Sequence, residues 1–220
     1  MLDLIWSSEL GGDPAAPRVR QWFFGYRQED GAPVSQSGKV LYVIVCAAGG
    51  AGDVGRLVAL AQDAGWAVQI VATPSALDFI DVPALERQTG RPVRSRYRKP
   101  DEPKPPRADA IIVAPATYNT INKFAQGIAD TYALGLLAEA PGLGIPVVVL
   151  PFVNGGLASR EPFRRSVESL RAEGVPVLLG SGRSEPDMTA AGGGEAESHP
   201  WALALEALAA LEGAGRRRRE

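Results

Sequence analysis

Four consecutive polar side chains follow a short apolar run near the middle of the chain. The run Ala110–Ala114 is rich in β-branched residues, so we predict a buried strand that ends at Pro115. The polar side chains then occupy the turn before a helix: Thr117, Tyr118, Asn119 and Thr120. In an open α/β sheet, ligands bind beyond the carboxyl ends of the strands, where such turns lie. Asn119 offers a donor and an acceptor on one short side chain, which suits a planar ring with alternating polar edges.

A glycine-rich turn follows the first predicted strand. Gly50, Gly52 and Gly55 fit the pattern GxGxxG between a strand and a helix, where bare backbone can approach a phosphate. A dinucleotide site also requires an acidic residue near the end of the second strand, and this chain has Thr73 and Ser75 there. Hydroxyls suit a terminal phosphate and provide no carboxylate for a ribose diol. The turn therefore favours a mononucleotide over NAD.

The central motif, residues 115–120, resembles the Pro-Ala-Ser-Ala-Asn-Thr signature of the flavin-containing cysteine decarboxylases. This family includes phosphopantothenoylcysteine decarboxylase and the peptide cysteine decarboxylases. Lys123, Gly127 and Asp130 also fit the family pattern. The resemblance implies FMN as cofactor and oxidative decarboxylation of a cysteine moiety in a small molecule or peptide. The cofactor-binding positions that we predict are Gly49, Gly50, Gly52, Thr73, Ser75, Ala114, Pro115, Thr117, Asn119 and Thr120.

The segment before the third predicted strand departs from the family pattern. The family carries a histidine there as its acid–base group, whereas this chain has Asp101 and Glu102 near that position. A carboxylate could accept the proton in place of an imidazole. The predicted catalytic residues are therefore Asn119, Asp101 and Glu102.

The segment after the fourth predicted strand departs from the family as well. The family motif Pro-x-Met-Asn-x-x-Met-Trp reads here as PFVNGGLA, residues 151–158, with smaller side chains at both Met positions and at the Trp position. Asn154 could hold a substrate carboxylate or amide, or it could form a turn before Gly155. We predict that Tyr118, Phe152 and Asn154 contact the substrate, in a pocket of altered shape.

Two alternative functions remain open. The loop 180–198 lacks the cysteine with which the pantothenate-pathway enzyme returns hydride to its product, so a decarboxylase of this type would stop at the enethiol. Arg160, Glu161 and Phe163 resemble a motif of the flavin prenyltransferases, a second branch of the superfamily. The missing histidine also fits a non-catalytic, flavin-binding regulatory subunit.

Apolar runs and helical faces alternate along the chain. We predict strands at 40–46, 67–73, 110–114, 145–150 and 175–179, and helices at 54–64, 75–80, 120–138, 161–173 and 200–211. With right-handed crossovers, this order predicts an α/β fold, a single Rossmann-like or flavodoxin-like three-layer sandwich with a mainly parallel sheet of five to six strands. Residues 39–212 would form this flavoprotein domain, between a flexible or docking arm (1–38) and a basic tail (213–220).

Composition limits the classes of partner. The net charge of −2 gives no overall attraction to nucleic acid, and no apolar stretch is long enough for a membrane span. One cysteine, Cys46, excludes an intramolecular disulfide and fits a reducing cytoplasm. No metal site is predicted. The family resemblance implies a homo-oligomer, most simply a trimer, with the cofactor near the subunit boundary.

Overall fold

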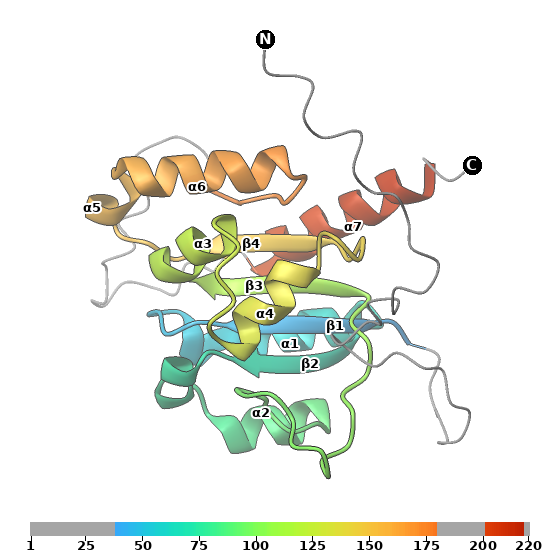
Figure 1. Cartoon of the computed structure of the whole chain (residues 1–220). Coiled ribbons are helices and arrows are strands. Elements are labelled where there is room, and N and C mark those ends of the chain that lie inside the picture. The colour runs from blue at the N-terminus through green and yellow to red at the C-terminus, as the bar shows by residue number, and fades with distance from the viewer. Residues whose placement is uncertain (1–37, 180–200, 218–220) are drawn as a thin grey trace, which may run out of the picture. The chain divides into compact units, whose positions relative to one another are not determined.

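A computed structural model of the chain describes residues 38–179 and 201–217 (Figure 1). The strands are β1 (Val40–Val45), β2 (Ala67–Ala72), β3 (Ala110–Ala116) and β4 (Val147–Pro151). The α-helices are α1 (Val54–Asp63), α2 (Val82–Thr89), α3 (Tyr118–Ala125), α4 (Tyr132–Glu139), α5 (Gly155–Ala158), α6 (Glu161–Ala172) and α7 (Trp201–Arg217). Two short 3₁₀ helices, η1 (Ala51–Asp53) and η2 (Pro74–Asp78), follow β1 and β2. Residues 1–37 of the predicted N-terminal arm and residues 218–220 of the predicted tail lie outside the described residues.

The four strands form one parallel sheet in the order β2-β1-β3-β4. All residues of β1 and β3 are buried, as expected for strands that read as continuous apolar runs. The prediction of five to six strands was too high for the described residues. The predicted strand 175–179 pairs with β4 only at one bridge, between Val149 and Val177. Pro176 has no backbone N–H, so the preceding hydrogen bond of a ladder cannot form.

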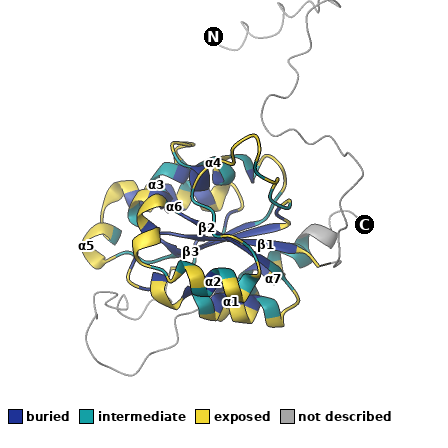
Figure 2. Ribbon diagram, turned by 90° about the horizontal axis from the view of Figure 1, so that it is seen from below, coloured by how far each residue is buried: buried dark blue, intermediate teal, exposed yellow. Residues whose placement is uncertain are grey.

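Helices cover both faces of the sheet and enclose a hydrophobic core on each (Figure 2). Side chains alternate between the faces of a strand, so β1 contributes to both cores. Tyr42 and Ile44 pack with α3, α4 and α6, whereas Leu41, Val43 and Val45 pack with α1, α2 and α7. The α/β three-layer sandwich predicted from the sequence is therefore confirmed.

The single long helix predicted for 120–138 was wrong, because two helices, α3 and α4, occupy this stretch. Gly127, with a φ of 68°, lies in the left-handed region that glycine adopts without strain and ends the turn after α3. Thr131 then caps α4, since its Oγ1 accepts a hydrogen bond from the backbone N–H of Leu134 at 3.2 Å. An ion pair between Lys123 and Asp130 closes the connection between the two helices.

Two helices and one strand boundary were not predicted. Asp81 starts α2 by accepting a hydrogen bond from the N–H of Ala84 at 2.9 Å. The four-residue helix α5 follows β4 in the predicted substrate segment. Pro115, expected to end the third strand, lies inside β3, where the pairing with β4 is irregular between Val113 and Ala116. Proline is tolerated at such an irregularity because no ladder hydrogen bond is required of it there.

Within residues 38–179 and 201–217, no helix combines the length and apolarity needed to cross a bilayer. Nor do three or more His, Cys, Asp or Glu side chains gather there in a group that could hold a metal ion.

Candidate active site

The carboxyl ends of the strands bring the predicted site segments together. Thr73, after β2, donates its backbone N–H to the last carbonyl of β1 at 2.9 Å. Cys46, after β1, donates its backbone N–H to the carbonyl of Pro115 in β3 at 3.1 Å. Phe152, after β4, donates in the same way to Ala116 at 2.8 Å. The segments therefore lie side by side along the edge at which open parallel sheets bind ligands.

A network of two hydroxyls and a thiol, with Cys46 and Thr120 buried and Thr117 half-buried, fixes the start of α3. The Thr117 Oγ1 caps the helix by accepting from the backbone N–H of Thr120 at 3.4 Å, and the two hydroxyls are 3.1 Å apart. The Cys46 Sγ donates to the Thr120 Oγ1 at 3.3 Å. Burial raises the pKa of the Cys46 thiol above its ordinary value. Thr120, predicted to bind cofactor, thus directs its hydroxyl inward, and Cys46 is a structural thiol.

The first two residues of α3 point in different directions. Asn119 is exposed at the sheet edge. Tyr118 is half-buried, and its ring stacks on Phe163 of α6 with 6.0 Å between the ring centroids and 17° between the planes. Ala114 and Pro115 are buried in β3, so their side chains are covered and the helix that follows them presents the exposed side chains of this motif. Asn119 is therefore the motif side chain best placed to meet a ligand.

The glycine turn after β1 is crowded at some positions and open at others. A Cβ on Gly49 would lie 3.0 Å from Cε1 of Phe152, so this glycine leaves room for an aromatic ring from the end of β4. A Cβ on Gly55 would lie 3.2 Å from Oε1 of Gln88, which allows α1 and α2 to pack closely. Gly52 is exposed, and a Cβ added there would make only an ordinary van der Waals contact, with the carbonyl oxygen of Phe79 at 3.6 Å. The turn thus stays open to solvent at Gly52.

Hydrogen-bond donors gather where η1, α1 and η2 begin. Asp53 precedes α1 and makes no side-chain capping bond, and Gly50 before η1 has no side chain to do so. Thr73 precedes η2, and its hydroxyl makes no capping bond either, while Ser75 is exposed. The backbone N–H groups of Ala51 and Asp53 already donate to the carbonyls of Ala48 and Gly50, so the hydroxyls of Thr73 and Ser75 are the donors that a phosphate could accept from. The residues predicted to bind a phosphate therefore have the appropriate chemistry.

Asn154, for which two roles were open, caps α5. Its Oδ1 accepts a hydrogen bond from the backbone N–H of Leu157 at 2.9 Å. The side chain is exposed. The capping bond uses one lone pair of the oxygen and leaves the N–H donors of the amide for other contacts.

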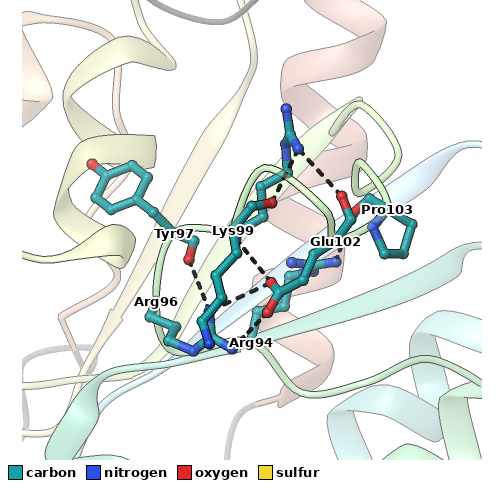
Figure 3. Close-up of polar contacts among 7 residues, drawn as sticks. Arg94, Arg96, Tyr97, Lys99, Glu102 and Pro103 are labelled. Atoms are coloured by element: carbon teal, nitrogen blue, oxygen red, sulfur yellow. Dashed lines mark hydrogen bonds and ion pairs between the residues drawn. The ribbon is translucent and has the colours of Figure 1, made fainter.

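Glu102, one of the two candidate proton acceptors, is bound by its own loop (Figure 3). Its Oε1 accepts from Nη2 of Arg96 at 2.7 Å, and its Oε2 accepts from the backbone N–H of Lys99 at 3.1 Å. The hydrogen bond from Arg96 holds the pKa of the Glu102 carboxyl below its ordinary value. Asp101 is exposed beside it. The structure thus ties Glu102 to the loop rather than to the start of α3.

The sequence did not predict the residues that pack against the site residues or hydrogen-bond to them. Phe163 was predicted within a helix and within a motif that resembles the flavin prenyltransferases, but its stacking on Tyr118 was not predicted, because it depends on how α6 crosses α3. The sequence showed Cys46 only as a single cysteine without an intramolecular disulfide, and its bond to Thr120 was not predicted. No pattern in the sequence pairs Arg96 with Glu102, because loop contacts follow no period.

A parallel sheet with helices on both faces and a ligand edge at its strand ends defines a doubly wound α/β protein. The family model "Flavoprotein" matches residues 32–209, and the chain belongs to this family. The resemblance that the central motif indicated is therefore confirmed.

Relatives and solved structures agree with this assignment. The coenzyme A biosynthesis bifunctional protein CoaBC of Bacillus subtilis is 30% identical over 142 residues, which cover 60% of this chain and 34% of that protein. The cypemycin decarboxylase CypD aligns with a TM-score of 0.62 and 26% identity over 82% of this chain and 97% of that chain. The FMN-dependent cysteine decarboxylase SpaF aligns with a TM-score of 0.55 and 26% identity over 64% of this chain and 83% of that chain. The chain spans between 24% and 54% of the length of the curated relatives it matches.

Proposed function

We propose that this protein binds FMN and catalyses the oxidative decarboxylation of a cysteine moiety in a small molecule or peptide. The observation that carries the proposal is the convergence, at one edge of the sheet, of the exposed amide of Asn119 with the uncapped glycine turn. The likeness to CypD and SpaF, each at 26% identity, supports the reaction class.

The residues at this edge fit FMN. The hydroxyls of Thr73 and Ser75 supply donors for its single phosphate, and the glycines after β1 let the backbone approach it closely. Residues 73–75 contain no carboxylate for the ribose diol of NAD. Asn119 carries both a donor and an acceptor for the polar edge of a flavin ring. Position 52 is an exposed glycine, so it carries no side chain that would obstruct the phosphate.

In the proposed reaction, the cofactor and the residues of the chain have separate roles. When bound, FMN supplies the acceptor for the hydride that leaves the cysteine side chain of the substrate. Asn119 orients the ring, and Asp101 or Glu102 accepts the proton of the substrate thiol. The oxidised substrate then loses carbon dioxide and becomes an enethiol. Because Cys46 is the one cysteine of the chain and is buried, the cofactor must be reoxidised by an external acceptor.

The first test is the cofactor and the product. The purified protein should be yellow and release FMN, rather than FAD or NAD, on denaturation, as measured by mass spectrometry. A peptide with a C-terminal cysteine should become lighter by carbon dioxide and two hydrogens. A protein that stays colourless when FMN is added would contradict the proposal. A flavin-loaded protein without turnover would favour the regulatory alternative, and a prenylated flavin product would favour the prenyltransferase alternative.

We also propose that the protein acts in the cytoplasm as a homo-oligomer, most simply a trimer, with FMN near the subunit boundary. Phe79 after η2 and Leu157 in α5 expose 52% and 36% of their surface close to the candidate site, and a neighbouring subunit would cover such side chains. Light scattering should give a mass of about three chains of 23.2 kDa each. A monomer that retains full affinity for FMN would contradict this arrangement.

A further inference from the structure

The network of two hydroxyls and a thiol at the start of α3 spans the point at which the strand order reverses. In the sheet, β2 lies on one side of β1, whereas β3 and β4 lie on the other side. Ligands of open α/β sheets bind in the crevice at such a switch point. Cys46 follows β1, and Thr117 and Thr120 follow β3, so the network joins the two segments that border this crevice.

The three groups of the network differ in their access to a ligand. Cys46 and Thr120 expose only 1% and 5% of their surface. Thr117 is half-buried, and it is the residue at which β3 gives way to α3. Of the three groups, the Thr117 hydroxyl is therefore the one that a ligand in the crevice can reach.

The buried hydroxyl of Thr120 has to donate its proton to Thr117. Among the described residues, its oxygen forms side-chain hydrogen bonds with Cys46 at 3.3 Å and with Thr117 at 3.1 Å. The Cys46 Sγ is the donor in the first of these bonds, and sulfur is only a weak acceptor. Buried polar groups are rarely left without a hydrogen bond. The Thr117 Oγ1 is thus the acceptor for the proton of Thr120.

Cys46 keeps the network in this direction as long as its thiol carries a proton. Burial raises the pKa of the Cys46 thiol above its ordinary value, although hydrogen bonds from Thr120 and Thr117 oppose the shift. A raised pKa means that the proton is held more tightly, so Cys46 remains a thiol at neutral pH. A thiolate would instead accept a proton from Thr120 and reverse the network.

The Thr117 oxygen accepts two hydrogen bonds within the network. One comes from the backbone N–H of Thr120 at 3.4 Å, and the other comes from the Thr120 hydroxyl. A hydroxyl oxygen has two lone pairs, so both are occupied and only the O–H of Thr117 remains. In the described part of the chain, this O–H has no acceptor. A ligand in the crevice therefore meets a donor at Thr117.

We propose that Thr120 and Cys46 orient the Thr117 hydroxyl as a hydrogen-bond donor, and that a bound FMN must present an acceptor atom to it. This inference rests on the proposed function and specifies the chemistry of its cofactor site. It makes Thr120 a positioning residue, where the sequence predicted a direct contact with the cofactor. The phosphate oxygens of FMN and the carbonyl oxygens of its ring are acceptors of the required kind. A ligand with an N–H or O–H at that place would meet a second donor and bind poorly.

Four substitutions of Thr117 separate the donor from the helix cap. Serine and asparagine keep both a donor and a capping acceptor, aspartate keeps only the capping acceptor, and valine keeps neither. The affinity for FMN, measured by titration of flavin fluorescence, should stay within about threefold of the parent value for Thr117→Ser and Thr117→Asn. It should fall by about tenfold or more for Thr117→Asp and Thr117→Val. Valine carries no charge, so its loss of affinity cannot come from repulsion of the phosphate.

Two results would overturn the donor role. If Thr117→Asp binds FMN like the parent protein, Thr117 only caps the helix. If Thr117→Val does so, the hydroxyl does not contact the ligand at all. Should Thr117→Val fail to fold, the contrast between asparagine and aspartate decides, and should both of these prove too large for the position, the contrast between serine and valine decides.

Thr120→Val tests the orientation of the donor, with Thr120→Ser as the matched control. Valine has the shape of threonine but no hydroxyl, so Thr117 loses its fixed direction and the affinity for FMN should fall by about three- to tenfold. Serine restores the hydroxyl and should restore the affinity. Once Thr117 is valine, Thr120→Val should have no further effect on the affinity. If the full effect persists in the double variant, Thr120 contributes only to the structure and its positioning role is wrong.

Riboflavin, which lacks the phosphate, locates the acceptor atom. If Thr117 donates to the phosphate, Thr117→Val should weaken the binding of FMN and leave that of riboflavin unchanged. If Thr117 donates to the ring or the ribityl chain, the binding of both should weaken by the same factor. A parent protein that binds no FMN would overturn the proposed function. A parent protein that binds FMN with an affinity that none of these substitutions alters would overturn only this inference.

Discussion

Replacing Asn119 with aspartate should lower turnover or FMN affinity by about 10²–10³-fold while leaving the domain folded. The aspartate has almost the same size but loses the amide donor, and it places a negative charge at the exposed start of α3. The fold should persist, because the side chain is exposed and the start of α3 is fixed instead by Thr117 and Thr120. Titration with FMN, followed by flavin fluorescence, measures the loss of affinity.

Gln126→Glu is the matched control for this substitution. It makes the same change from amide to carboxylate at an exposed position just after the same helix. The control should bind FMN and turn over like the parent protein. If Asn119→Asp also behaves like the parent in both measurements, Asn119 does not contact the flavin.

Asp101→Asn should reduce turnover by about 10²–10⁴-fold, the usual contribution of an acid–base group, whereas Glu102→Gln should cost little. The difference follows from Arg96, which lowers the pKa of the Glu102 carboxyl and leaves it a poor proton acceptor. Asp101 is exposed in the same loop and is not the carboxylate bound by Arg96. Turnover of a cysteine-terminated substrate by each variant measures the contrast.

The two carboxylate variants control for each other, since each removes one negative charge from the same loop. The lowered pKa of Glu102 means that its pair with Arg96 persists as the pH falls and is lost only when the pH passes through that lowered value. As long as the pH stays above that lowered value, the segment 94–107 should therefore keep the ion pair between Arg96 and Glu102. If both variants turn over at the parent rate, the proton acceptor lies elsewhere or the thiol is already ionised when it binds.

The sequence predicted the elements whose signal is local. The runs that became β1 and β3 are continuous and apolar because both faces of the sheet are covered, and this pattern is readable without a structure. The division of 120–138 into two helices depended on one glycine conformation, at Gly127, and on the Lys123–Asp130 ion pair. The helical spacing of apolar residues continues across this turn, so the sequence pattern does not indicate that the helix breaks there.

The candidate site was predicted as a set of segments, but not as a set of side-chain directions. The order of the strands places Thr73, the glycine turn and the Asn119 motif at one edge, and the alternation of strands and helices was enough to expect this. The inward direction of Thr120 and the pairing of Glu102 with Arg96 depend on contacts between residues that no pattern relates. Asn154 kept two possible roles until the helix that it caps was visible.

The ring of Phe152 against Gly49 couples two parts of the site that are far apart in the chain. Phe152 belongs to the segment predicted to select the substrate, and Gly49 belongs to the turn predicted to receive the phosphate. The permitted size of the side chain at position 49 therefore depends on the residue at position 152. Under the proposed function, a change at either position would alter both substrate preference and cofactor affinity, and a search for variants with a new substrate range would vary both positions together.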